Sequence, residues 1–436
     1  IIQYSDERQI FYLVPDINQI DEVIIISPVF SGKLKSSSSS ISILPSSYLE
    51  DQNSINIADH LNNLPGVFMA EGAYTTNRLT IRGVGSRTPY ASNRISAFLD
   101  NIPLTSGEGI TSLEDIDING LGRIEVIKGP YASVYGSGLG GIVKMMIKQP
   151  NKEGFSLKAA SEAGSYQSFR NSVTASMKKN DKSGIISFTN TSSEGYRENS
   201  NYSRNSAFLK LTDENLKSRI SLSLNYTDVN AQIPSSINEE NFINDPSSAA
   251  SNWLEVEGFE RYQRLLSGIN ADFHLTPDLN TQLTVFSVIN DGYESRPFNI
   301  LDDASFNAGF RNHWTWEKKI LNIQAGGEFF YEQYKWKIYE TLSGEQGRRI
   351  NENRELRNYF NVFANARLSL SDRLYFESGM NFNSLHYKLE DIFDSEGVDL
   401  SGEYTYDPVF SPRIGLNYMY YDGLHLFLSA GHGYSA

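Results

Sequence analysis

Alternating apolar and polar residues dominate the chain from about residue 155 onward. In residues 359–370, Phe360 and Val362 lie on an apolar face, and Asn361 lies on the opposite, more polar face. The same two-residue period returns at residues 374–382, 414–420 and 424–430. Successive side chains of a strand point to opposite sides of a sheet, so this pattern predicts β-strands with one apolar face. We expect about 13 such strands.

The connections between these strands alternate in length. Short ones are predicted near residues 180–181, 214–215, 277–278, 317–318, 371–372 and 422–423. Long ones are predicted at residues 231–258, 294–306, 341–354 and 389–410. Strands of about 10 residues with such connections are typical of outer-membrane β-barrels. The alternative is a soluble β-sandwich, which rarely needs strands or loops of this length.

Residues 41–150 have a different pattern. Short β-branched segments at residues 79–82, 96–99, 123–128 and 141–147 are separated by turns rich in Gly and Pro. Residues 56–64 have helical spacing, with Ile57, Leu61 and Leu64 on one side. Five glycines, which suggest positive φ or close backbone approach, are Gly129, Gly136, Gly138, Gly140 and Gly141. A compact α+β domain is therefore expected before the strand-rich region.

This domain contains several ordered motifs. They are Ile-Arg-Gly at 81–83, Asp-x-Ile-Pro at 100–103, Arg-Ile-Glu-Val-x-Lys-Gly-Pro at 123–130 and Tyr-Gly-x-x-x-Gly-Gly at 135–141. Their order and spacing resemble the plug domain of TonB-dependent outer-membrane receptors. The resemblance implies a membrane β-barrel with an N-terminal mixed α+β plug in its lumen. A barrel wide enough for a plug needs about 22 antiparallel strands. We therefore expect strands beyond the end of this sequence.

The N-terminal residues fit the same resemblance. The family's TonB box is assigned to Asp21, Glu22, Val23, Ile24, Ile25 and Ile26. An apolar extended segment can pair with a partner's sheet through main-chain hydrogen bonds. The alternative is an ordinary last strand of a small N-terminal sheet. The serine run at 36–40 is expected to be a mobile linker.

The expected domains are four. They are the end of a carboxypeptidase-regulatory-like domain (1–20), the TonB box and linker (21–40), the plug (41–150) and an incomplete barrel (151–436). The first residues are not a signal peptide, so we expect the natural start to lie upstream.

Composition and motifs narrow the function. The net charge is −14, which argues against nucleic-acid binding, and the chain has no cysteine. No run of 18 apolar residues occurs, so no transmembrane helix is predicted. The six histidines form no metal-binding pair. The Gly-rich run at 136–141 formally fits a dinucleotide motif, but an apolar strand-like segment follows it. We expect no enzyme, no cofactor and no resident metal.

The resemblance implies active import of a scarce nutrient across the bacterial outer membrane, most simply a ferric siderophore or another iron complex. Alternatives are cobalamin, haem, peptide or glycan import by the same mechanism, or a passive porin or adhesion barrel. Expected partners are the TonB C-terminal domain with its inner-membrane energising complex, outer-membrane lipids, the iron chelate and a surface lipoprotein.

Two sets of site residues follow from this resemblance. Substrate-binding candidates on the external face of the plug are Arg87, Tyr90, Asn93, Arg94, Tyr74 and Glu108. Arginine suits carboxylate-rich chelates, and tyrosine offers a flat amphipathic surface. A solvated turn is the alternative for residues 87–94. For the contact between plug and barrel, we expect Arg82 or Arg123 to pair with Glu328 or Glu377, because strand parity points both glutamates into the lumen.

Overall fold

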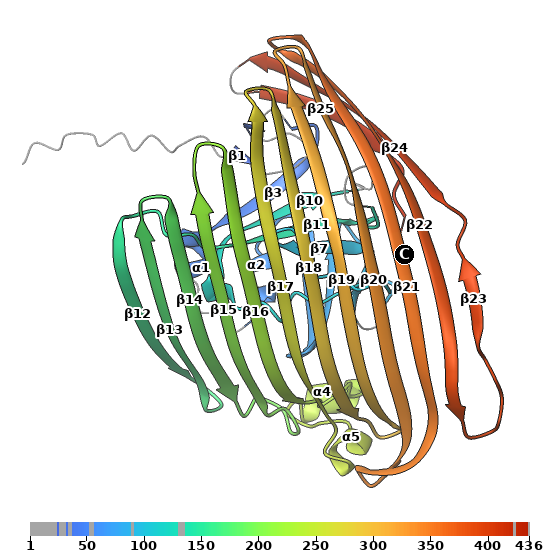
Figure 1. Cartoon of the computed structure of the whole chain (residues 1–436). Coiled ribbons are helices and arrows are strands. Elements are labelled where there is room, and N and C mark those ends of the chain that lie inside the picture. Colours follow the sequence, from blue (N-terminus) through green and yellow to red (C-terminus); the bar gives the residue numbers. More distant parts are fainter. Residues whose placement is uncertain are drawn as a thin grey trace, which may run out of the picture.

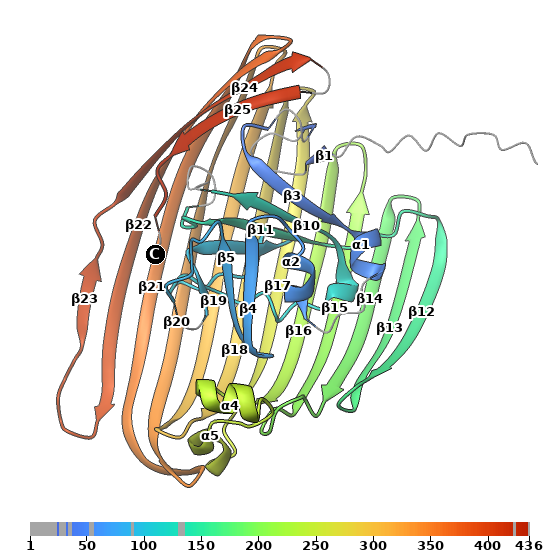
Figure 2. The same cartoon turned by 180° about the vertical axis from the view of Figure 1, so that it is seen from behind.

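The computed structural model describes residues 24–25, 32–33, 37–51, 56–88, 91–129, 136–421 and 424–434. An antiparallel sheet of 14 strands, here called the outer sheet, curves around a smaller inner domain built from residues 37–148 (Figure 1). Seen from behind, the inner domain lies in the concave face of the outer sheet (Figure 2). This arrangement matches the expected plug within a curved wall of strands.

The outer sheet follows chain order, except that β23 lies beside β22 and leaves β22 paired with β24. Its strands are β12 (Gly154–Gly164), β13 (Ser168–Lys179), β14 (Lys182–Ser193), β15 (Tyr202–Glu214), β16 (Ser218–Gln232), β17 (Phe259–Thr276), β18 (Leu279–Ser295), β19 (Ile300–Glu317), β20 (Leu321–Leu342), β21 (Glu345–Ser371), β22 (Leu374–Asp394), β23 (Gly402–Thr405), β24 (Val409–Tyr421) and β25 (Leu424–Gly431).

The two ends of the outer sheet differ. One end carries the long connection between β16 and β17, with helices α4 (Glu239–Asn244) and α5 (Ser251–Glu255); this is called the loop end. The opposite end, called the turn end, carries the connections 180–181, 215–217, 277–278, 318–320 and 372–373, and it lies on the side of β1 (Ile24–Ile25) (Figure 1). The predicted short turns within the described residues are confirmed. The turn predicted at 422–423 lies outside the described residues.

Two predicted long loops are wrong. β18 and β19 are joined by residues 296–299, and β20 and β21 by residues 343–344. The segments assigned to these loops continue the strands, because each finds a hydrogen-bonded neighbour along its whole length. The 231–258 loop is present, and the 389–410 segment is shortened by strands at both ends and by β23.

The alternation of side chains is confirmed on the outer sheet. On β21, Phe360 is 47% exposed on the convex face, whereas Asn361 is fully buried against the inner domain. The outward face is apolar and the inward face is polar. This is the inverse of the arrangement in a soluble protein, and it suits contact with lipid. Parity also places Glu328 and Glu377 inward, where both are buried.

The inner domain is built on a five-stranded sheet of order β3-β10-β11-β7-β8, in which β11 and β7 are parallel. Its strands and helices are β3 (Ser40–Pro45), α1 (Ser46–Asp51), α2 (Ile57–Leu61), β4 (Val67–Ala73), β5 (Thr76–Ile81), β6 (Ser92–Asn93), β7 (Ile95–Leu99), β8 (Ile102–Pro103), β9 (Ile110–Thr111), η2 (Ile118–Gly120), β10 (Leu121–Lys128) and β11 (Gly141–Ile147). No helix among the described residues is long and apolar enough to cross a membrane.

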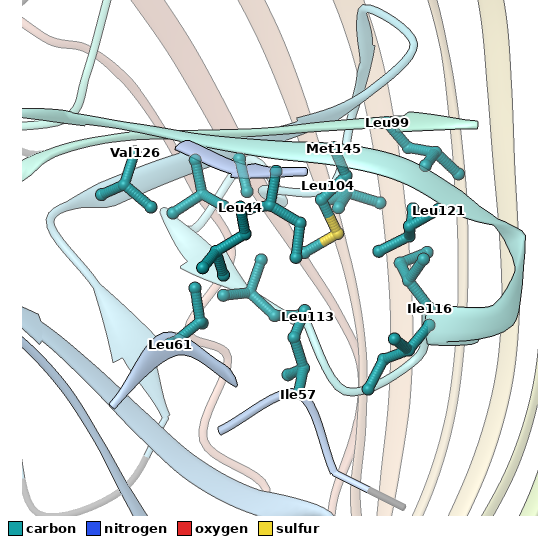
Figure 3. Packing of buried hydrophobic residues seen from close by; sticks show 14 of the residues in the cluster. Leu44, Ile57, Leu61, Leu99, Leu104, Leu113, Ile116, Leu121, Val126 and Met145 are labelled. Carbon is teal, nitrogen blue, oxygen red and sulfur yellow. The ribbon is translucent and has the colours of Figure 1, made fainter. Parts of the chain in front are cut away.

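The expected helix begins where the sequence indicates. The Asn56 side chain accepts the Ala58 N–H and caps α2, so one unpaired donor of the first turn is satisfied. Ile57 and Leu61 then point into the core together with Leu44, Leu113 and residues of the central sheet (Figure 3). The same cluster includes Phe208 and Leu266 of the outer sheet, so the inner domain packs directly on its wall.

The predicted glycine conformations are mostly found. Gly129, Gly136, Gly138 and Gly141 have positive φ, whereas Gly140 does not. At Gly141 a Cβ atom would lie 2.3 Å from the Ile127 carbonyl oxygen, so only glycine fits between these two strands.

Candidate functional site

A cavity of about 840 Å³ lies between the inner domain and the outer sheet at the loop end. Its inner wall comes from the β4–β5 tip and from residues 106–115. Its outer wall comes from inward positions of β17 to β20, and residues of the 233–258 connection and the 296–299 turn complete it. This volume lies in the range of pockets for small organic ligands, which is roughly 300–1,000 Å³.

The β4–β5 hairpin carries one part of the inner wall toward the loop end. Tyr74, at its tip, stacks on Tyr202 of β15 with ring centroids 4.3 Å apart. Stacked aromatic pairs contribute about 0.5–1.5 kcal/mol beyond their buried area. The hairpin is therefore fixed against the sheet at the cavity.

The 106–111 loop forms the next part of the wall. The Gly107 N–H donates to Glu332 of β20 at 2.8 Å, and Arg357 of β21 donates to Glu108 at 3.0 Å. A Cβ atom at Gly107 would lie 2.7 Å from the Glu332 carboxylate, so glycine permits this close approach. Arg357 also contacts Glu332 and Glu355, so one guanidinium serves three carboxylates.

The cavity wall is aromatic and acidic. Its aromatic side chains are Trp253, Tyr262, Tyr293, Phe298 and Tyr334, and Trp253 meets Phe298 edge-on with centroids 6.4 Å apart. Among the described residues that line it, eight are Asp or Glu and three are Arg. Burial raises the pKa of the Glu114 carboxyl to about 8, and the neighbouring Asp115 carboxylate adds to the rise.

Ion pairs join the inner domain to the outer sheet around and below this cavity. In each of them a carboxylate of the inner domain meets a cation of a strand. The pairs are Asp100–Lys210 (2.5 Å), Asp115–Arg264 (2.5 Å), Asp117–Arg170 (3.1 Å) and Glu108–Arg357 (3.0 Å). All except Glu108 are well buried, so they fix the inner domain in one position within the sheet.

Comparison with known proteins agrees with this architecture. The family model described as the TonB-dependent receptor plug domain matches residues 33–143. This chain carries a TonB-dependent receptor plug domain. The ferrioxamine receptor of Yersinia enterocolitica is 33% identical over 114 residues, which are 26% of this chain and 15% of that receptor.

Solved structures extend the likeness to the outer sheet around the plug domain. The unliganded ferric citrate transporter FecA superposes with a TM-score of 0.79 at 14% identity, covering 91% of this chain and 63% of that one. The ferric yersiniabactin uptake receptor FyuA of Yersinia pestis gives 0.72 at 14% identity, covering 90% and 64%. At this identity the matches show a shared fold. The chain spans less than two thirds of these structures and about a seventh of the ferrioxamine receptor.

The predicted substrate-binding residues separate into two groups. Glu108 lines the cavity, and Tyr74 sits on the hairpin whose neighbouring residues line it. Arg87, Asn93 and Arg94 are not among the described residues that line it. Tyr90 lies outside the described residues.

Residues 87–94 have local contacts of their own. Asn93 accepts a hydrogen bond from the Thr88 hydroxyl and pairs with Ile110. The Arg94 carbonyl accepts the Gly140 N–H, and Arg87 is exposed. Their role in ligand binding stays a prediction.

The arginines and glutamates that were expected to pair between plug and barrel have other surroundings. Glu328 lies 3.4 Å from Arg311, and Glu377 pairs with Arg367 and Arg413, all on the outer sheet. Arg82 is exposed, because β5 ends at Ile81 and the next residue turns with a φ of 51°. Arg123 pairs with Glu125 on its own strand at 2.7 Å. The plug domain is held instead by its own carboxylates.

The serine linker differs from its expected mobility. Ser38 is fully buried, donates to Glu377 and accepts from Arg413 at 2.7 Å. Asn417 donates to the Ser37 carbonyl at 2.9 Å. Inward polar side chains of β22 and β24 thus hold this segment against the wall.

The TonB box is described only in part. Ile24 and Ile25 form β1 and pair with Lys33 and Gly32 of β2 (Gly32–Lys33). Asp21, Glu22, Val23 and Ile26 lie outside the described residues.

Sequence reasoning missed the three aspartates that join plug domain and sheet, Asp100, Asp115 and Asp117. A signal for their partners was present. Lys210 shares the inward parity of Arg204, Ser206 and Phe208. Parity therefore predicts that this cation faces the plug domain. Which plug residue meets it depends on the packing of the two parts.

Proposed function

We propose that this chain belongs to a TonB-dependent transporter that imports an iron chelate across the bacterial outer membrane. One observation carries the proposal: a cavity of the size of an organic ligand faces the loop end. The plug domain lies between this end and the turn end of the outer sheet (Figure 2). The ligand occupies the cavity first, and movement of the plug domain then gives it a path inward.

Energy for that movement has to come from outside the chain. A ligand shifts an equilibrium only by its differential affinity, so binding alone drives no uphill transport. The segment containing Ile24 and Ile25 supplies a point of attachment, since it already forms a strand pair with β2. Strand addition by the TonB C-terminal domain is the proposed contact. A passive porin or an adhesion barrel has no use for a filled lumen with a strand-forming segment beside it.

Iron is the proposed cargo because the relatives are named for ferrioxamine, ferric citrate and ferric yersiniabactin. Tyr74 and Glu108 are the proposed ligand contacts from the earlier candidates. The protein itself contributes aromatic surface and charge to the site, while the ferric ion stays within its chelate.

The test compares binding and uptake in cells that depend on this protein. Radioactive ferric siderophores are offered to iron-starved cells with the gene intact or deleted. Ile24→Pro removes the N–H of this residue and fixes its φ, so we expect uptake to fall to the deletion level while binding on ice is retained. Ile24→Val keeps the strand and serves as the matched control.

Two outcomes count against the proposal. Unchanged uptake of every siderophore in the deletion strain contradicts iron import. Uptake at the wild-type rate by the Ile24→Pro variant contradicts the TonB-box assignment.

A further inference from the structure

The cavity at the loop end is acidic on two independent walls. On the outer sheet, Glu260 of β17 and Glu294 of β18 are direct cross-strand partners, and Asp303 lies on β19 beside them. Like charges directly opposite each other destabilise a strand pair. Arg296 pairs with Glu294 and offsets part of this repulsion, while Glu260 and Asp303 add further negative charge to the same wall.

The plug domain repeats the pattern from the other side. Glu71, Glu108 and Glu114 all line the cavity. The buried Oε2 atom of Glu114 receives no hydrogen bond from any described residue. A polar atom buried without a partner is costly, so a donor from a ligand would stabilise it.

The cations of the wall are already engaged. Arg264 pairs with Asp115, Arg296 pairs with Glu294, and Arg197 donates to backbone carbonyls of the 233–258 connection. Outside the lining, Arg357 is shared among three glutamates. Positive charge is thus used within the wall, and the excess carboxylates face the cavity.

The aromatic side chains favour the same class of ligand. Tyr262, Tyr334 and Trp253 line the cavity, and aromatic faces attract cations.

We infer that this cavity selects organic metal chelates carrying positive charge over anionic chelates of the same size. The inference rests on the proposed import function and names the class of its substrate. An ammonium or guanidinium group on the organic part of the chelate would lie among Glu260, Glu294 and Asp303. An anionic chelate would be repelled by both walls.

The test uses three matched probes with the full chain in detergent at pH 9, above the pKa of about 8 that burial gives Glu114, so that the carboxylates of both walls are ionised. The probes are a ferric tris-hydroxamate with a pendant primary amine (charge +1), its N-acetyl form (neutral) and its N-succinyl form (charge −1). Binding is followed by quenching of tryptophan fluorescence, since Trp253 lines the cavity. We expect affinity to fall about tenfold for each unit of charge, from +1 to −1. Raising the salt concentration should weaken the cationic probe and leave the neutral one unchanged.

Variants locate the effect. The double variant Glu260→Gln/Asp303→Asn should reduce the preference for the cationic over the neutral probe from about tenfold to about threefold. Binding of the neutral probe serves as the folding control. Asp302→Asn is the matched control, because Asp302 lies next in sequence, pairs with Lys337 and does not line the cavity. It should leave the charge preference intact.

The outcomes separate the two proposals. Equal binding of all three probes, or tightest binding of the anionic one, overturns the charge inference and leaves iron-chelate binding in place. Binding of none of them overturns tris-hydroxamate binding itself, and with it this inference. A preference that stays at about tenfold for each unit of charge in the Glu260→Gln/Asp303→Asn variant also contradicts the assignment to this wall.

Discussion

The buried pair between Asp100 and Lys210 should hold the plug domain in the outer sheet. Asp100 lies in the turn between β7 and β8, and one of its oxygens is 2.5 Å from the Lys210 ammonium on β15. Both side chains are 8% exposed. Asp100 also accepts the Ile147 N–H at 3.1 Å and the Ser223 hydroxyl at 3.3 Å. Asp100→Asn keeps the shape of this contact and removes its charge.

The expected magnitude follows from burial. Removing one member of a buried ion pair leaves the other charge uncompensated and costs about 3–5 kcal/mol. At about 1.4 kcal/mol for each factor of ten, the population of displaced or unfolded plug domain should rise by about two to three and a half orders of magnitude. Lys182–Asp213 offers a control, since these side chains are 75% and 53% exposed. Such exposed pairs contribute about 0–1 kcal/mol.

The assay is urea unfolding of the plug domain in detergent-solubilised protein, together with sensitivity of cells to a large antibiotic that the outer membrane excludes. Asp100→Asn should lower the midpoint and increase sensitivity, and Lys182→Met should change neither. The double variant Asp100→Asn/Lys210→Met should recover part of the loss, since it removes both charges. Equal midpoints for Asp100→Asn and Lys182→Met, or no recovery in the double variant, would refute the reasoning.

Three further predictions concern single side chains. Ser38→Ala removes the hydroxyl between Glu377 and Arg413, so trypsin should cut the segment before Ser37 faster. An unchanged cleavage rate would contradict a structural role for this contact. Glu328→Ala removes the carboxylate 3.4 Å from buried Arg311, whose guanidinium carbon lies 4.8 Å from the ring centroid of Phe98 in the plug domain. Loss of this support should loosen the plug domain and make cells more sensitive to excluded antibiotics, whereas wild-type resistance argues against it. Glu114 faces Asp115, Glu260 and Arg264, and its pKa is about 8 in the folded chain. In the unfolded chain its pKa is about 4.5. The folded state therefore becomes less stable as pH rises from about 4.5 to 8, because the carboxyl ionises more readily in the unfolded chain. Glu114→Gln should then raise the thermal midpoint more at pH 9 than at pH 5, with exposed Glu194→Gln as control, and an equal gain at both values would contradict the shift.

The sequence alone determined the strand-rich wall and the faces of its strands. Two-residue alternation assigned Phe360 to the convex face and Asn361 to the lumen, because parity within a strand needs no knowledge of its neighbours. Motifs between residues 79 and 147 marked the plug domain, and the helical spacing of Ile57 and Leu61 marked α2. These features depend on local geometry, so they can be predicted from a single chain.

The tertiary structure decided where strands end and which charges meet. β20 continues to Leu342 and β21 starts at Glu345, because a strand extends as far as its neighbour supplies hydrogen bonds. The partner of Lys210 is Asp100, 110 positions away, whereas sequence reasoning paired plug arginines with barrel glutamates. Parity gives the direction of a side chain but neither its height along the wall nor its position around it. Those two coordinates are set by how the plug domain packs in the sheet, and they brought the carboxylates of both walls together around one cavity.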